Sequence, residues 1–456
     1  MPALDDPLRS TTRPVVMAIS ACGERARYAS GDDRSRQKEK DTMQAALGIL
    51  ILLGIGWALS EDRRGVPWRI VGVALALQIG IALLIVHVSF VQDLLLALNG
   101  VVVALDNAAG AGAAFVFGYL GGAEPPFDVA NPGALFIFSF RLAAQILLFS
   151  VVMAIGWYWG IVPAIVRAIG GALRRTLGVG GAVGLGAAAS IFVGPVETAL
   201  TVRPALAGMS RGELFMLLTA PMATVAGTVM VLYASILEAV LPASLGHILA
   251  ASVISAPAAI LFGVLMVPTR PGTGAESGEP SLPETDYDGL MDAITRGTGD
   301  GLRLAANVLA MLVVFVALVA LVNEMLGVLP AVAGEAVTLE RILGWLFAPV
   351  AWLIGLPWSE ASTGGSLLGT KLVLNELLAY LELASLPEGT LSAHGVLVLT
   401  YAMCGFANFG TLGIMVGGLL ALVPERRADV LALAPRTLIS GTLATLTTGA
   451  VVGLVT

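Results

Sequence analysis

Apolar runs long enough to cross a membrane recur along the whole chain after Met43. The hydrocarbon core of a bilayer is about 30 Å thick, and a helix needs roughly 20 predominantly apolar residues to cross it. With 57% hydrophobic and only 12% charged residues, the composition lies outside the range of soluble proteins. The sequence therefore predicts an all-α integral membrane protein that crosses the bilayer many times.

Eight apolar segments are predicted to be transmembrane helices, namely 44–60, 68–91, 134–160, 213–237, 246–267, 300–328, 393–423 and 437–456. Segment 93–118 carries polar residues at intervals, which predicts an interfacial helix. Segments 178–209 and 340–384 are interrupted by glycine, proline and polar residues, so we expect two re-entrant hairpins. Arginines that follow predicted helices one, three, five and seven then all lie on the cytoplasmic face, as the positive-inside rule requires.

The predicted organisation has six parts. Residues 1–42 are a polar tail, either disordered or added by a mis-assigned start codon. Two scaffold segments and two transport halves follow, separated by a polar cytoplasmic linker rich in proline, glycine and serine. Their ranges are 43–160 (scaffold and interfacial helices), 161–267 (first transport half), 268–299 (linker), 300–339 (scaffold helix) and 340–456 (second transport half).

The two transport halves resemble each other. Each has a re-entrant segment with one glutamate, GPVETA or PWSEAS, and then a helix interrupted by small and polar residues, LTAPMATVAGT or LTYAMCGFANFGT. Repeats with discontinuous helices that meet near the bilayer midplane are typical of secondary transporters. The sequence therefore predicts an inverted-repeat transport core.

Glu197 and Glu360 are the carboxylates of the two repeated segments. A charge at the bilayer centre costs about 2.5–3.5 kcal/mol on insertion scales, so each is expected either to line a polar site or to pair with a cation, Arg203 or Lys371. As an acid/base pair they would suit an intramembrane enzyme, but no nucleophile or histidine cluster accompanies them. A channel or a receptor on the same fold is a further alternative.

Other polar residues stand near the interrupted helices. Asn408 and Thr411 share a helix face and could bind a polyhydroxylated ligand, or bond between helices. Ser190 and Thr224 could offer oxygens to a monovalent cation, or bond to their own helices. Phe406 could flank a planar ligand or serve in packing. The three scattered histidines and two cysteines predict no metal cluster, and the charge distribution indicates no nucleic-acid partner.

From Met43 to the C-terminus the chain resembles the concentrative nucleoside transporters. The resemblance rests on FVGPVETAL, RGELFMLLTAPMATVAGTVM, PWSEASTGGSLLGTKLVLNELLAYL and TYAMCGFANFGTLGIMVGGLLALVPERRADV. It implies a homotrimer in the bacterial cytoplasmic membrane that takes up nucleosides or related ribosyl compounds by an elevator-like motion. The driving force would be a sodium or proton gradient, and no other cofactor is expected.

The resemblance also implies site residues. Glu360, Asn408 and Thr411 would bind the ribose hydroxyls, Glu197 would lie near the substrate, and Phe406 would lie beside the base. The sodium ligands would come from Ser190, Val193, Thr224 and Val225. Serine at 190 replaces the asparagine of sodium-coupled members, and proton-coupled relatives often carry serine there, so the coupling ion stays open.

The first hairpin departs from the family pattern. Most members have glutamine and a hydroxyl residue between the glycine and the glutamate, where both read the base edge. This chain has Gly194, Pro195, Val196 and Glu197. Neither Pro195 nor Val196 can hydrogen-bond a base, so the sequence predicts a relaxed or altered base preference.

Overall fold

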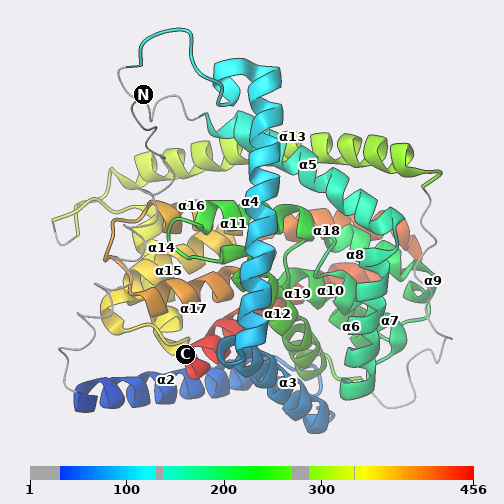
Figure 1. The fold of residues 1–456 in the computed structure, drawn as a ribbon. Coiled ribbons are helices and arrows are strands. Elements are labelled where there is room, and N and C mark those ends of the chain that lie inside the picture. Colours follow the sequence, from blue (N-terminus) through cyan, green and yellow to red (C-terminus); the bar gives the residue numbers. More distant parts are fainter. Residues whose placement is uncertain (1–30, 130–136, 270–286, 333) are drawn as a thin grey trace.

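The computed structural model describes residues 31–129, 137–269, 287–332 and 334–456 (Figure 1). Within these ranges the chain is almost entirely helical, and the only β-type pairing is one isolated bridge. The helices are α2 (Gly31–Ala58), α3 (Trp68–His87), α4 (Ser89–Phe117), η2 (Gly118–Gly121), α5 (Phe138–Tyr158), α6 (Ile161–Leu177), α7 (Gly181–Ala189), α8 (Pro195–Thr201), α9 (Arg203–Leu206), α10 (Arg211–Ala223), α11 (Gly227–Leu237), α12 (Ser244–Met266), α13 (Leu290–Leu326), α14 (Leu339–Leu353), α15 (Trp358–Val373), α16 (Glu376–Ser385), α17 (Ala393–Met403), α18 (Phe409–Leu422), η4 (Pro424–Arg426) and α19 (Arg427–Val455).

In the described part of the chain, seven segments are long and apolar enough to cross a membrane, and the bent pair α14 and α15 would make an eighth. Six of the seven overlap six of the eight predicted helices, and the seventh, Val103–Gly121, overlaps the segment predicted to be an interfacial helix. The other two predictions, 44–60 and 393–423, correspond to shorter apolar helices, because α17 and α18 are separate pieces. The fold is therefore that of an all-α membrane protein, as predicted.

Two sets of elements repeat the same order along the chain. The first set consists of the long helix α5, the shorter helix α6, the hairpin α7 with α8, the broken helix α10 with α11 and the buried helix α12. The second set has the same order: the long helix α13, the shorter helix α14, the hairpin α15 with α16, the broken helix α17 with α18 and the buried helix α19. In Figure 1 the elements α6 to α10 lie to the right and α14 to α17 to the left, with α12 and α19 packed on each other between them. The second pieces of the broken helices cross over, since α11 packs on α16 and α18 packs on α8.

Burial divides the spans into two classes. In α12, 89% of the apolar stretch is buried within the protein, and α10 with α11 and α19 are similar. In α13 and α4 only 11% is buried, which leaves most of their apolar side chains facing outward. Apolar side chains on the outside are expected where lipid or a partner subunit is the neighbour.

The helices α6 and α14 were not predicted as separate elements. In α6 the residues Val162, Val166, Gly170, Leu173 and Leu177 are buried at spacings of three and four, and arginines occupy the other face. This amphipathic pattern places one stripe of the helix against the protein and the other toward a polar surface. The prediction of one hairpin over 340–384 is corrected accordingly: α14 is a helix of its own, bent 117° from α15 at residues 354–357.

Three other boundaries differ from the predicted ones. Helix α2 begins at Gly31, inside the predicted polar tail, since residues 31–42 are rich in helix-forming lysine, glutamate, glutamine and arginine. Helix α13 begins at Leu290, so it takes in the last ten residues, 290–299, of the predicted linker. Residues 1–30, 130–136 and 270–286, which hold most of the predicted tail and linker, lie outside the described residues.

A cluster of ion pairs joins the loop after α2 to the starts of α10 and α19. Arg211 lies 3.0 Å from Glu61 and 3.1 Å from Asp429, and Arg436 also contacts Glu61. The hydrogen bond from Arg211 lowers the pKa of the Glu61 carboxyl below its usual value. The groups are partly exposed, so each pair contributes little alone, but together they fix three segments at one end of the core.

The close packing of α14 on α15 generates a test of the fold. A Cβ atom at Gly365 would lie 2.6 Å from the backbone nitrogen of Ala348 and 2.7 Å from the carbonyl oxygen of Gly344. We expect Gly365→Ala to force the helices apart and to cost about 1–3 kcal/mol, lowering the thermal midpoint in detergent.

The matched control is Gly417→Ala, because Gly417 is an exposed helical glycine with no heavy atom within 4 Å of the added methyl. Alanine favours a helix by up to about 1 kcal/mol over glycine, so the control midpoint should stay or rise. Equal midpoints for the two variants would contradict the packing described here.

Candidate functional site

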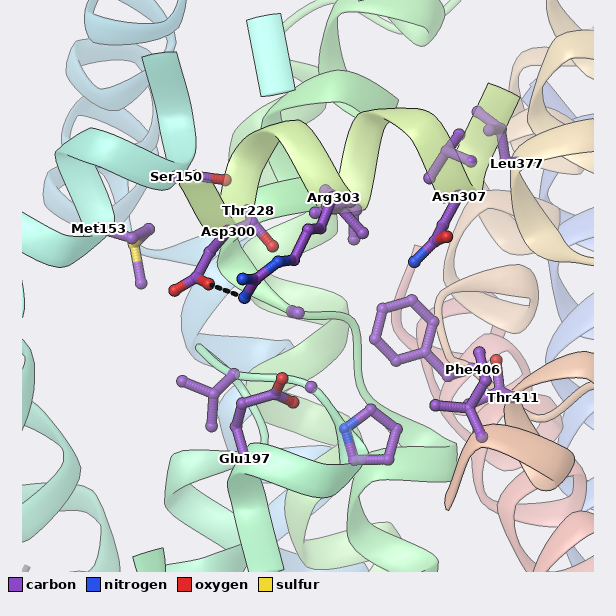
Figure 2. A pocket seen from close by; sticks show the side chains of 18 of the residues that line it. Ser150, Met153, Glu197, Thr228, Asp300, Arg303, Asn307, Leu377, Phe406 and Thr411 are labelled. Carbon is purple, nitrogen blue, oxygen red and sulfur yellow. Dashed lines mark ion pairs between the residues drawn. The ribbon is translucent and has the colours of Figure 1, made fainter. Parts of the chain in front are cut away.

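A cavity of about 950 Å³ lies between the two hairpin tips, the two helix breaks and the helices α5 and α13. Its size is that of a small-molecule site. Side chains from both halves of the repeat enter it, as Figure 2 shows. The polar or aromatic residues that matter below are Glu197, Tyr233, Asn307, Glu376, Phe406, Asn408 and Thr411.

Glu376 is the carboxylate buried most deeply in the wall of this cavity. It is the first residue of α16, and only 3% of its surface is exposed. The hydroxyl of Tyr233 on α11 donates to one carboxylate oxygen at 2.6 Å, and the Asn408 amide donates to the other at 2.9 Å. The carboxylate thus connects the second hairpin to pieces of both broken helices.

Asn408 is held in one orientation by its position in the chain. It caps the N-terminus of α18, where its amide oxygen accepts a hydrogen bond of 2.7 Å from the Thr411 backbone. The amide nitrogen is therefore the atom that faces Glu376. Thr411 follows one helical turn later and lines the cavity together with Phe406. The predicted grouping of Asn408, Thr411 and Phe406 agrees with this geometry.

The first hairpin contributes Gly194, Pro195 and Glu197 to the cavity. Glu197 lies in the first turn of α8, where the helix dipole favours a negative charge. A Cβ atom on Gly194 would lie 2.6 Å from the Glu197 carboxylate, so glycine permits this close approach. Val196 does not line the cavity, because its methyl groups pack against Gly418 of α18.

Glu360 is not brought to the cavity, and its placement with Asn408 and Thr411 is corrected. It lies in the first turn of α15, where its carboxylate accepts hydrogen bonds from the backbone nitrogen (3.0 Å) and hydroxyl (3.2 Å) of Ser392. It therefore joins α15 to the start of α17. The alternative pairing with Lys371 is also not formed, since no described residue accepts a hydrogen bond from Lys371.

The four residues considered for a cation lie where the first hairpin meets the break between α10 and α11. The Thr224 hydroxyl donates to the Ser190 carbonyl at 2.7 Å, and to its own helix at Ala220. Val193 lines the cavity, whereas Ser190 and Val225 are buried behind it. Ser190 and Thr224 thus form an oxygen-rich junction, in which the Thr224 hydroxyl and the Ser190 carbonyl are hydrogen-bonded to each other.

Helix α13 supplies polar groups that the sequence analysis missed. Asp300, Arg303 and Asn307 recur at spacings of three and four and line the cavity opposite Glu197 (Figure 2). Asp300 and Arg303 are 3.5 Å apart and largely exposed, so their ion pair adds little stability. The spacing of these residues could have predicted a polar helix face, but the first of them lies at the predicted boundary between the linker and the helix.

Three family profiles match the chain: the N-terminus of the Na+ dependent nucleoside transporters over residues 47–120, their C-terminus over 247–453, and a nucleoside recognition (Gate) domain over 139–240. An uncharacterized transporter, YutK of Bacillus subtilis, is 36% identical over 90% of this chain and 98% of its own. The putative nucleoside permease NupX of Escherichia coli is 35% identical, and the match covers 91% of this chain and 98% of NupX.

A solved structure, CNTnw in an inward-facing substrate-bound state, superimposes with a TM-score of 0.83. Its sequence is 35% identical, and the match covers 91% of this chain and 98% of that one. The agreement in sequence and in fold extends over the whole described core. The chain therefore belongs to the family of Na+ dependent, concentrative nucleoside transporters.

Proposed function

We propose that this protein is a symporter that takes up nucleosides or related ribosyl compounds across the bacterial cytoplasmic membrane, driven by a cation gradient. The observation that carries the proposal is the buried group of Glu376, Asn408 and Tyr233 at the wall of a cavity between two helix breaks. The family contains transporters and not enzymes, and the separation of Glu360 from Glu197 removes the basis for an acid/base pair.

Ribose recognition is assigned to the second hairpin and to α18. Each carboxylate oxygen of Glu376 accepts one hydrogen bond from the protein and has capacity for a second, so two adjacent ribose hydroxyls could donate to it. Thr411 offers a further hydroxyl, and Phe406 offers a ring face to the base. In this assignment Glu376 takes the place that the sequence analysis gave to Glu360.

Transport is assigned to a motion of the buried core against the outer helices. The hairpins, broken helices, α12 and α19 form one densely packed unit, whereas α13 and α4 expose most of their apolar surface. We propose that the first group carries the substrate and that the second group, with α3 and α5, forms a static scaffold within a homotrimer. The cavity lies between the two groups, which suits an elevator-type exchange of access.

Sodium is the coupling ion that the family description favours. The carbonyl of Ser190 and the hydroxyl of Thr224 would be two of its ligands, with the carbonyls of Val193 and Val225 as the others. Hard cations prefer such oxygen ligands. For sodium to bind, the Thr224 hydroxyl would have to turn its proton away from Ser190, so binding would loosen the hairpin contact that exists without the ion.

Uptake into proteoliposomes tests the function directly. With purified protein and an inward sodium gradient, labelled uridine or adenosine should accumulate above its external concentration. A proton gradient without sodium should give little accumulation. Nucleoside that only equilibrates under either gradient would indicate a channel, and no uptake at all would contradict the proposal.

Substitution of Glu376 and of Glu360 tests which of the two carboxylates binds the ribose, Glu376 as assigned from the structure or Glu360 as predicted from the sequence. Glu376→Gln should weaken nucleoside binding about 10- to 100-fold, because hydrogen bonds to a charged acceptor contribute about 1.5–3 kcal/mol. Glu360→Gln is the matched control and should leave the dissociation constant unchanged, since Glu360 bonds to Ser392 outside the cavity. Equilibrium binding of labelled nucleoside in detergent measures both. The reverse ranking would restore Glu360 as the ribose ligand.

Base preference should depend on position 195 and not on position 196. Pro195 lines the cavity, so Pro195→Gln introduces an amide that can bond a base edge, and discrimination among uridine, cytidine, adenosine and inosine should rise several-fold. Val196→Thr is nearly isosteric and should change nothing, because this side chain packs on Gly418. Competition of each nucleoside against labelled uptake is the measurement. Sharper selectivity from Val196→Thr alone would contradict this reading of the hairpin.

A further inference from the structure

Lys371 is the one lysine or arginine that is fully buried among the described residues, with 2% of its surface exposed. It lies in the last turn of α15, just before the tip of the second hairpin. No described residue accepts a hydrogen bond from its ammonium group. Burying an isolated charge is very costly, so a lysine in this position requires a compensating negative charge.

Glu376, on the other side of the same hairpin tip, is the one buried carboxylate among the described residues. The two residues lie five positions apart at the junction of α15 and α16, both side chains are buried, and no hydrogen bond joins them directly. Both oxygens of Glu376 are instead occupied by neutral donors, Tyr233 and Asn408. Glu376 lines the cavity and Lys371 does not, so a charge on Lys371 would stabilise the carboxylate without occupying the substrate side.

The internal repeat allows the position of Lys371, at the end of α15, to be compared with the end of α7 in the first half. In the first half, the end of α7 faces the break between α10 and α11, and the groups collected there are oxygens, those of Ser190 and Thr224. In the second half, α15 packs on α17, and the buried basic side chain in the last turn of α15 is Lys371. One half therefore offers ligands for a mobile cation, while the other already holds a cation.

We propose that Lys371 is a tethered cation that replaces a coupling ion in the second half of the repeat and positions Glu376, as a carboxylate, for the substrate. The proposal rests on the proposed function, because it concerns the same binding site. Lys371 and Glu376 belong to one hairpin and would move together, so this charge pair persists in every transport state. Only the first-half cation would then be exchanged with each cycle.

Few other ionisable groups lie near Glu376, and none of them could supply the positive charge in place of Lys371. The ones that face Glu376 or Lys371 are Tyr233 of α11, Tyr380 of α16 and Cys404 at the end of α17. None of these three is a cation at any pH. Asn408, which comes from α18, does not ionise in this range.

Lys371→Met keeps the length and apolar stem of the side chain and removes its charge. We expect the nucleoside dissociation constant to rise at least 10-fold, while the rate of uptake at saturating substrate changes little, since Lys371 touches neither the cavity nor the substrate. An unchanged dissociation constant in a folded variant would overturn the proposal.

A second measurement covers the case in which Lys371→Met folds poorly. The same change is made on the Glu376→Gln background, where Lys371 is left as a buried charge without its partner. There Lys371→Met should raise the thermal midpoint, whereas on the wild-type background it should lower it, because removing one partner of a buried pair destabilises and removing both does not. A loss on both backgrounds would mean that Lys371 serves only in packing and would overturn the proposal.

The outcomes separate this inference from the proposed function. If the wild-type protein binds no nucleoside, the proposed function fails whatever the variants do. If the wild type binds nucleoside and Lys371→Met binds it equally well, only the tethered cation is refuted. The opposite shifts of the two thermal midpoints do not depend on any substrate, so they test the charge pair by itself.

Discussion

The two helix breaks are held open by backbone groups that bond to each other. The Phe406 N–H, in the second break, donates to the Thr224 carbonyl in the first break at 3.2 Å, and the Gly227 N–H donates to the Phe192 carbonyl of the first hairpin at 2.9 Å. Inside a membrane an unsatisfied backbone group costs several kcal/mol, so a broken helix persists only where such partners exist. Asn408 and Thr411 depend on these contacts, because they follow directly after the second break and line the cavity.

The crossing of the two halves follows from the same constraint. Once α10 and α17 stop short, their continuations α11 and α18 begin from the same central point and lean on the opposite hairpin. Tyr233 reaches Glu376 for this reason, although 143 positions separate them along the chain. The residues that line the cavity therefore come from both halves, and neither half could form it alone.

Much of this arrangement was readable from the sequence. Long apolar runs located six of the spans, and the Gly, Pro and Asn residues that interrupt two of them located the breaks. The family resemblance predicted Glu197, Phe406, Asn408 and Thr411 as site residues, and these four line one cavity. The missed helices α6 and α14 are amphipathic and adjoin apolar segments, and a hydropathy pattern merges them with their neighbours. Contacts between distant segments, such as Tyr233 with Glu376, leave no local signal.

The misplacement of the second hairpin tip has a specific cause. Segment 340–384 contains two points where the helix breaks, one at Pro357 and one at Asn375. The first break resembles GPVE because a proline precedes a glutamate in the first helical turn, and it was therefore taken for the tip. The true counterpart is the second break, where Asn375 caps α16 by accepting a hydrogen bond from Leu378 and Glu376 begins the helix. An N-cap residue marks a helix start in both places, Pro357 in one and Asn375 in the other, but only tertiary packing decides which start lies at the cavity.

The uneven distribution of polar groups around the cavity limits where base selectivity can arise. The second hairpin and α18 are rich in hydrogen-bonding groups. In the first hairpin Glu197 offers a carboxylate, but the Pro195 side chain offers no donor or acceptor, and Asn307 on α13 faces the cavity from the outer helices. If the hairpins move against α13, any bond from Asn307 to the substrate is broken during each cycle. Under the proposed elevator motion, Glu376 and Asn408 would travel with the substrate and could hold it in all states. Hydrogen-bonded base discrimination that lasts through such a cycle would come from the first hairpin, where Pro195 offers no side-chain donor or acceptor.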